Sequence, residues 1–87
     1  MRQRRIGWAE GAWARFNDLR PSLQEVEAVG AILERAAKDD PNDPAVGFEI
    51  PFSGVLRERT WRVDVGRFAV HYQYKPGRLY VTEVWLS

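Results

Sequence analysis

Apolar residues recur at helical spacing through the first forty positions of the chain. The first stripe is formed by Ala9, Ala12, Trp13, Phe16 and Leu19. Pro21 ends the helix that this stripe predicts, and Ser22–Glu25 has the capping-box pattern that begins a second helix. The second stripe runs to about residue 37, where Asp, Asn and Pro residues predict a turn. We expect two antiparallel helices, with Gly30 allowing their close approach, and a short strand before them at 4–8.

The pattern changes to alternation in the second half of the chain, as in strands with one buried face. The alternating segments are Thr60–Val65, Phe68–Tyr74 and Leu79–Leu86, separated by turn residues. Val46–Phe52 contains Pro51 and is predicted to be a short edge strand or a loop. Together these segments predict an α+β fold in which a helical hairpin packs on one face of a small antiparallel sheet. The residues assigned to the core include Trp8, Trp13 and Trp61.

The length of 87 residues predicts a single domain, spanning residues 1–87, with a small core. The chain has no cysteine and one histidine, which argues against disulfides, thiolate chemistry and a structural zinc site. We therefore expect no metal and no cofactor. No apolar run has the roughly 20 residues that a membrane helix needs. The basic N-terminus is followed by a segment too broken for a signal peptide, so we expect a cytoplasmic location without membrane contact.

The net charge of +1 conceals an uneven distribution. Residues 21–49 carry two basic and seven acidic side chains, whereas residues 50–78 carry six basic and two acidic ones. Basic segments favour anionic partners such as RNA or an acidic polypeptide, although solvated surface positions have the same composition. The candidate RNA- or partner-binding residues are therefore Arg57, Arg59, Arg67, Lys75 and Arg78. Tyr72 is a further candidate for stacking on bases, with a core position as the alternative.

Arg62 and His71 are the candidate catalytic residues. By alternation, His71 lies on the face of its strand that the apolar residues do not occupy, and Arg62 faces the same groove from the neighbouring strand. An imidazole serves as acid or base near neutral pH, and a guanidinium binds phosphate through two hydrogen bonds. The alternative is an exposed strand histidine beside an arginine that pairs with a carboxylate. Trp85 is a candidate for a partner groove, because aromatic residues are enriched at interface centres.

The strand region resembles a known family. The segment from Trp61 to Tyr72 reads W-R-V-D-V-G-R-F-A-V-H-Y, and Leu79 to Val84 reads L-Y-V-T-E-V after a hairpin. With the order strand–helix–helix–strands, these motifs resemble the RelE/ParE superfamily of bacterial type II toxin–antitoxin systems. The resemblance implies a RelE/ParE-like fold and a cognate antitoxin protein as partner. It also implies inhibition of translation, through ribosome-associated mRNA cleavage, or inhibition of DNA gyrase.

The chain departs from the ribonuclease members of this superfamily at three places. Arg62 matches a basic position that holds mRNA in those members, but Asp64 and Ala69 stand where the resemblance implies basic residues. Trp85–Leu86 stands where the family often has His-Arg. An mRNA endoribonuclease toxin with an incomplete catalytic set is therefore one hypothesis. The alternative is a catalytically silent RelE-like module that binds or regulates a protein.

Overall fold

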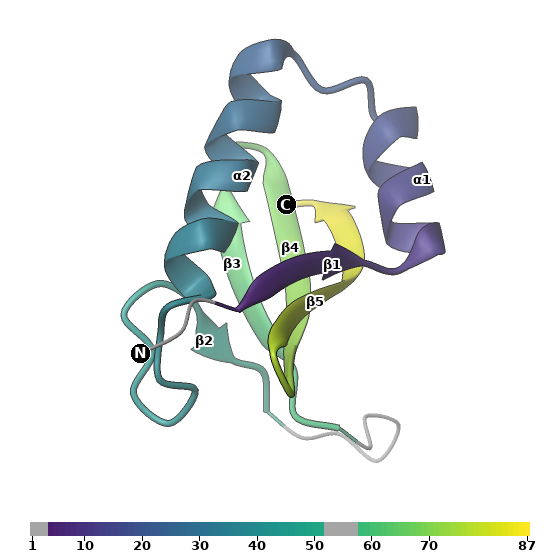
Figure 1. Cartoon of the computed structure of the whole chain (residues 1–87). Coiled ribbons are helices and arrows are strands. Elements are labelled where there is room, and N and C mark those ends of the chain that lie inside the picture. Colours follow the sequence, from purple (N-terminus) through teal and green to yellow (C-terminus); the bar gives the residue numbers. More distant parts are fainter. Residues whose placement is uncertain (1–3, 52–57) are drawn as a thin grey trace.

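The computed structural model describes residues 4–51 and 58–87, which form two helices and a five-stranded sheet (Figure 1). In chain order the elements are β1 (Arg5–Trp8), α1 (Glu10–Asp18), α2 (Leu23–Ala36), β2 (Phe48–Glu49), β3 (Trp61–Val65), β4 (Phe68–Lys75) and β5 (Arg78–Leu86). The strand order is β1-β5-β4-β3-β2. The predicted α+β class is confirmed, and of the two alternatives predicted for 46–52, an edge strand or a loop, residues 48–49 form an edge strand. No helix in the described part of the chain is both long and apolar enough to cross a membrane.

The sheet is mixed, which corrects the prediction of an antiparallel one. Four of its strands, β2 to β5, pair antiparallel. β1 instead runs parallel to β5, from Arg5 beside Arg78 to Trp8 beside Val81. The Arg5 amide donates to the Gly77 carbonyl in the β4–β5 turn, so β1 starts at the same end of the sheet as β5. The sequence of so short a strand gives no signal for its direction, because side-chain alternation is the same in both directions.

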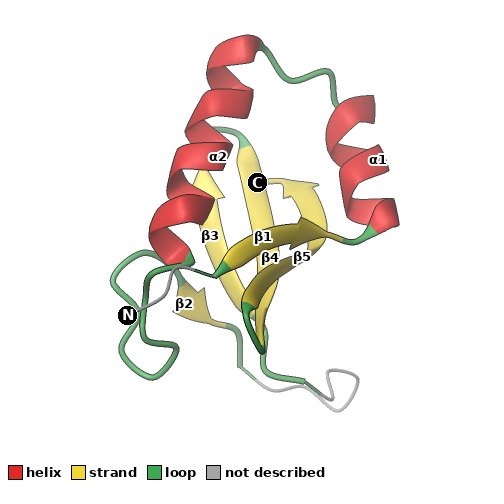
Figure 2. Cartoon of the chain, viewed as in Figure 1, coloured by secondary structure: helices red, strands yellow, loops and turns green. Residues whose placement is uncertain are grey.

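Both helices pack on one face of the sheet, as the sequence predicts (Figure 2). α1 contributes Ala12 and Phe16 to the core, and α2 contributes Val29, Leu33 and Ala36. The strand side chains in this core are Trp61, Val63, Phe68, Val70, Tyr72, Leu79, Val81 and Val84. They alternate along β3 and β4, as strands with one buried face require. Burial of these apolar side chains is the main favourable contribution to folding.

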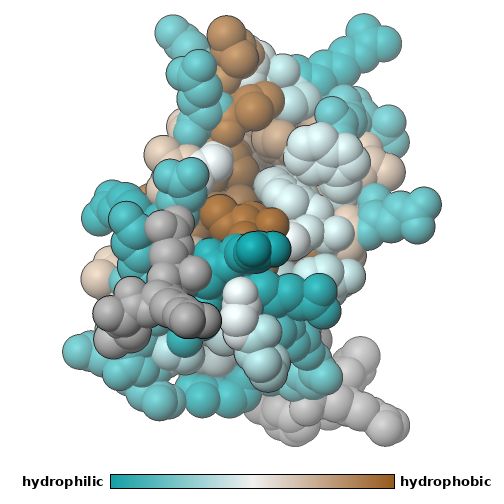
Figure 3. Space-filling view, viewed as in Figure 1, coloured by the Kyte–Doolittle hydropathy of each residue, from teal (hydrophilic) through white to brown (hydrophobic). Residues whose placement is uncertain are grey.

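The two helices diverge instead of packing against each other (Figure 1). A Cβ added at Gly30 would meet no atom within 4 Å beyond its own helix, so the predicted close approach there is wrong. Trp13 of α1, which the sequence assigns to the core, is 51% exposed, and Leu23 and Val26 of α2 are exposed as well. Figure 3 shows hydrophobic residues gathered along the side of α2 that faces α1. The space between the helices therefore leaves apolar side chains in contact with solvent.

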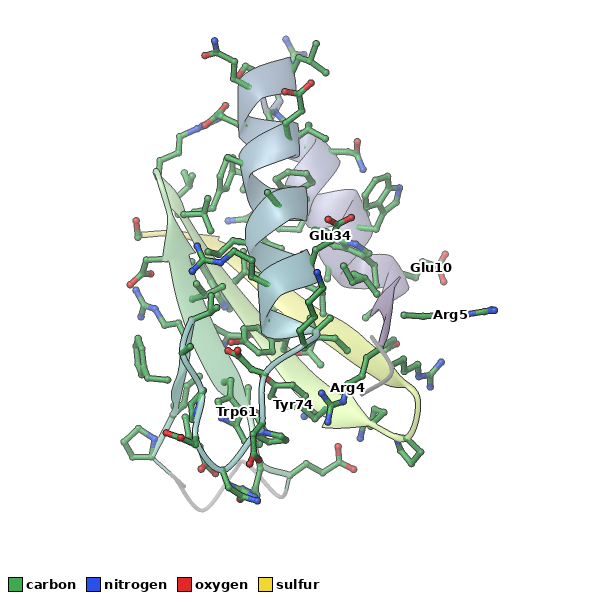
Figure 4. The ribbon with its side chains drawn as sticks, turned by 60° about the vertical axis from the view of Figure 1, so that its left-hand side comes forward. Arg4, Arg5, Glu10, Glu34, Trp61 and Tyr74 are labelled. Atoms are coloured by element: carbon green, nitrogen blue, oxygen red, sulfur yellow. The ribbon has the colours of Figure 1, made fainter. Side chains whose placement is uncertain are left out.

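Polar contacts fasten the segment between α2 and β2 to the rest of the fold. Asp39 Oδ2 accepts hydrogen bonds from the amides of Ala45 and Val46, at 3.0 and 3.1 Å. Arg4 donates to the Asp39 carbonyl at 2.9 Å, and its guanidinium lies 4.8 Å from the centre of the Tyr74 ring (Figure 4). These contacts determine where the chain enters β2 at the edge of the sheet.

Candidate functional site

The face of the sheet opposite the helices carries the candidate catalytic residues. In the cross-strand register, Arg62 on β3 lies beside His71 on β4, and His71 lies beside Glu83 on β5. The next row along the sheet consists of Asp64, Ala69 and Trp85. The prediction that Arg62 and His71 share one face is therefore confirmed. We call these six residues the open-face cluster.

His71 is partly buried and lies among charged groups of both signs. Its side chain is 21% exposed, and its Nδ1 lies 3.9 Å from Glu83 Oε2. Burial lowers the pKa of His71 and outweighs the opposing effect of the Glu83 carboxylate. The imidazole is therefore mainly neutral at pH 7, which suits a base better than a proton donor. Trp85 Nε1 donates to Glu83 Oε2 at 2.8 Å and holds that carboxylate beside the histidine.

The charges of the open-face cluster do not favour phosphate binding. Arg62 is bound to Asp64 on its own strand, with Nε 3.0 Å and Nη2 2.9 Å from Oδ1. Asp64 therefore competes for the guanidinium that a phosphate would need. With His71 neutral, the carboxylates of Asp64 and Glu83 outnumber the single arginine, so the cluster carries a net negative charge. Such a charge repels a phosphodiester instead of stabilising its transition state.

Two of the predicted basic residues are paired with carboxylates at one end of the sheet. Arg59 Nε lies 2.8 Å from Glu49 Oε2, and Lys75 Nζ lies 2.5 Å from Glu58 Oε2. Exposed ion pairs of this kind add little stability. They do, however, offset the positive charge that binding to RNA depends on.

The other predicted binding residues differ in their accessibility. Arg78 is exposed, and its guanidinium lies 5.1 Å from the centre of the Tyr80 ring. Arg57 lies outside the described residues. Tyr72 is fully buried on the face that the helices cover, and burial raises the pKa of its hydroxyl. A base or a partner side chain cannot reach Tyr72 without opening the core, so its predicted binding role is wrong.

Arg67 connects the β3–β4 turn to both helices and has a structural role. Its Nε lies 2.6 Å from Glu25 Oε2, and its Nη2 donates to the Leu19 carbonyl at 3.0 Å. Glu25 also accepts the Ser22 amide at 2.9 Å in the capping box that begins α2. One arginine therefore joins the end of α1, the start of α2 and the sheet, and it is not a free cation for RNA.

We expect the Arg67–Glu25 contact to make stability depend on pH in the acid range. The hydrogen bond from Arg67 lowers the pKa of Glu25 from 4.5 to about 2. The ionised carboxylate therefore stabilises the fold above pH 4.5, and this contribution is lost as the pH falls toward 2. The melting temperature of the native protein should exceed that of Glu25→Gln at neutral pH, and the difference should shrink on acidification. A difference that stays constant down to pH 2 would contradict this prediction.

Two exposed aromatic residues lie on the open face, Trp85 within the open-face cluster and Phe48 next to it. Phe48 on β2 is 52% exposed beside Arg62, and Trp85 on β5 is 48% exposed beside Ala69. The accessibility of Trp85 agrees with its predicted place in a partner groove. Sequence reasoning missed Phe48, because a strand of two residues has no periodicity that shows which face a side chain takes.

The described residues contain no group of three or more His, Cys, Asp or Glu side chains arranged to hold a metal ion. Comparison of the chain with family models, curated proteins and solved structures finds no match.

Proposed function

We propose that this chain is the toxin-like member of a toxin–antitoxin pair and that it acts by binding proteins, not by cutting RNA. The observation that carries the proposal is the charge of the open-face cluster. Arg62 is paired with Asp64, His71 is mainly neutral, and Glu83 adds a further negative charge. A negatively charged cluster with exposed aromatic residues within and beside it suits a polypeptide better than a polynucleotide.

The toxin-like part of the proposal is supported by the strand motif and by the order of the elements. The motif W-R-V-D-V-G-R-F-A-V-H-Y occupies β3, the turn and β4, next to the strand that carries L-Y-V-T-E-V. In the superfamily that these motifs resemble, the gyrase inhibitors act without the basic set of the ribonucleases. Acidic or small residues at positions 64 and 69 are therefore compatible with a toxin that blocks a protein target.

A second candidate function is mRNA cleavage, which the pairing of Arg62 with His71 favours. A neutral imidazole is able to accept a proton from a ribose hydroxyl. Arg62 would have to leave Asp64 to hold the scissile phosphate. The net negative charge of the open-face cluster makes this the weaker candidate.

We expect His71→Gln to leave growth inhibition unchanged when the chain is expressed in a bacterial host. Glutamine keeps the polarity and approximate size of the side chain, so stability should change by less than about 0.5 kcal/mol. Loss of a proton-transferring histidine would instead lower activity by about 10²-fold or more. Growth curves of cells expressing the two forms measure the difference. Growth inhibition that disappears in a stably folded His71→Gln protein would favour mRNA cleavage.

Co-expression with the product of the adjacent gene tests the pair itself. That product should relieve growth inhibition and co-purify with this chain in a stable complex. The variant Arg35→Gln, which changes an exposed cation on α2, on the other side of the sheet from the open-face cluster, is the control and should retain both effects. A chain that neither inhibits growth nor forms such a complex would contradict the toxin–antitoxin proposal.

A further inference from the structure

Three cations form a row across neighbouring strands at the end of the sheet where β4 turns into β5. In the cross-strand register, Arg5 on β1 lies beside Arg78 on β5, and Arg78 lies beside Lys75 on β4. Residues paired in this way project from the same face of a sheet, on strands about 4.8 Å apart. We call these three residues the cationic row.

The cationic row lies on the same face of the sheet as the open-face cluster, at the other end of the strands. Lys75 is an even number of positions from His71 on β4, so strand alternation puts both side chains on one face. A Cβ added at Gly7, which shares the face of Arg5, would lie 4.0 Å from Cδ of Arg78. The side chains of β1 and β5 therefore meet on this face.

Two of the three cations have no carboxylate partner among the described residues. Lys75 pairs with Glu58, but Arg5 and Arg78 are exposed and form no ion pair within 4–51 and 58–87. Arg5 points away from the fold (Figure 4). The guanidinium of Arg78 lies 5.1 Å from the centre of the Tyr80 ring, a contact that orders it without neutralising it. Like charges opposite each other on neighbouring strands destabilise a sheet. A bound anion would relieve this repulsion.

The surroundings of the cationic row favour a phosphate backbone over a polypeptide as that anion. Protein interfaces are built around exposed aromatic and apolar side chains, whereas a polyanion is held by cations alone. The exposed large apolar side chains of the described residues lie on the helices, on β2 or at the opposite end of β5, and they are Trp13, Leu23, Val26, Phe48, Trp85 and Leu86. None of them adjoins the cationic row.

The same surroundings favour a duplex over a single strand. Proteins that hold single strands stack the unpaired bases on aromatic side chains. The aromatic ring beside the cationic row is that of Tyr80, and the guanidinium of Arg78 already covers one of its faces. A duplex keeps its bases stacked on each other and requires only phosphate contacts from the protein.

We propose that the cationic row binds the phosphate backbone of a double-stranded nucleic acid without reading its sequence. Arg5 and Arg78 supply the two main contacts, and Lys75 supplies a weaker one because Glu58 competes for it. The inference does not rest on the proposed function. It adds a second surface, at the opposite end of the face that carries the open-face cluster.

Fluorescence anisotropy with labelled DNA and RNA duplexes tests the proposal. The logarithm of the affinity should fall linearly with the logarithm of the salt concentration, with a slope of about −2 to −3, because each phosphate contact contributes about −0.9. Duplexes of unrelated sequence should bind equally, since phosphate contacts carry no sequence information. A single strand of the same length should bind more weakly. The tighter of the DNA and RNA duplexes identifies the source of the backbone.

Two double variants separate the cationic row from the net charge. Arg5→Gln with Arg78→Gln should weaken duplex binding roughly tenfold or more and flatten the salt slope by about two. Its melting temperature should equal or exceed that of the native protein, because the repulsion between the two strands is removed. Arg15→Gln with Arg35→Gln removes two exposed cations from the helices, with the same change in net charge, and should bind duplexes as the native protein does.

The proposal is overturned if neither duplex binds at low salt, or if the folded Arg5 and Arg78 double variant binds as tightly as the native protein. An equal loss in the Arg15 and Arg35 double variant would also overturn it, by showing that net charge alone is responsible. Tighter binding of the single strand would contradict duplex recognition. Binding of polyglutamate but of neither duplex would replace the nucleic acid by an acidic polypeptide.

Discussion

Replacing Trp61 by alanine is expected to lower the free energy of unfolding by about 3–5 kcal/mol, because the substitution leaves a cavity in the core. The Trp61 side chain is 2% exposed, and its ring meets that of Tyr74 edge to face, with centroids 4.8 Å apart. It starts β3, on the face that α2 covers. Urea unfolding followed by circular dichroism measures the change.

Trp85→Ala is the matched control, because it removes the same side chain from the opposite face of the sheet. Trp85 is 48% exposed, so its removal should cost less than about 1.5 kcal/mol. A cost below about 1 kcal/mol for Trp61→Ala would mean that β3 turns its other face to the core.

Gly47→Ala is expected to destabilise the fold by about 1–3 kcal/mol or more, because the site has no room for a methyl group. An added Cβ would overlap the Tyr72 hydroxyl and lie 2.8 Å from the Arg62 carbonyl oxygen. Neither neighbour moves easily, since Tyr72 is in the core and the carbonyl belongs to β3. Gly11→Ala is the control, and should be neutral or stabilise the fold by up to about 1 kcal/mol. Thermal and urea unfolding of both variants measure the contrast.

Tyr72→Phe tests whether the hydroxyl is the main obstacle at Gly47. The Tyr72 hydroxyl is buried and has no hydrogen-bond partner among the described residues, so its removal alone should be neutral or stabilising. In the Tyr72→Phe background, Gly47→Ala should cost less than it does in the native protein. Equal costs in the two backgrounds would show that the Arg62 carbonyl is the decisive contact.

The elements of the fold could be predicted because their signals are local. The capping box at Ser22–Glu25 and the turn at Pro76–Gly77 are both present, and Gly77 has the positive φ, 74°, that the turn requires. The direction of β1 and the divergence of the helices depend on contacts far apart in the sequence. Trp13 illustrates this limit, because it fits the apolar stripe of α1 and yet remains exposed where α2 does not cover it.

The candidate site, like the fold, could be predicted from the sequence only where the signal is local. Alternation across the tight turn at Gly66 was enough to place Arg62 and His71 on one face. The ion pairs that change its chemistry were not predictable, because Arg67 and Glu25 are 42 residues apart and no local pattern joins them. The charge counted along the sequence therefore overstated the basic surface that the folded chain presents.

Mapping of mRNA 5′ ends after induction in bacterial cells distinguishes a chain that acts through protein contacts from one that cleaves mRNA. If it acts through protein contacts, growth inhibition should occur without new 5′ ends relative to uninduced cells, for the native protein and for His71→Gln alike. New 5′ ends that appear with the native protein and disappear with a folded His71→Gln protein would show instead that the chain cleaves mRNA.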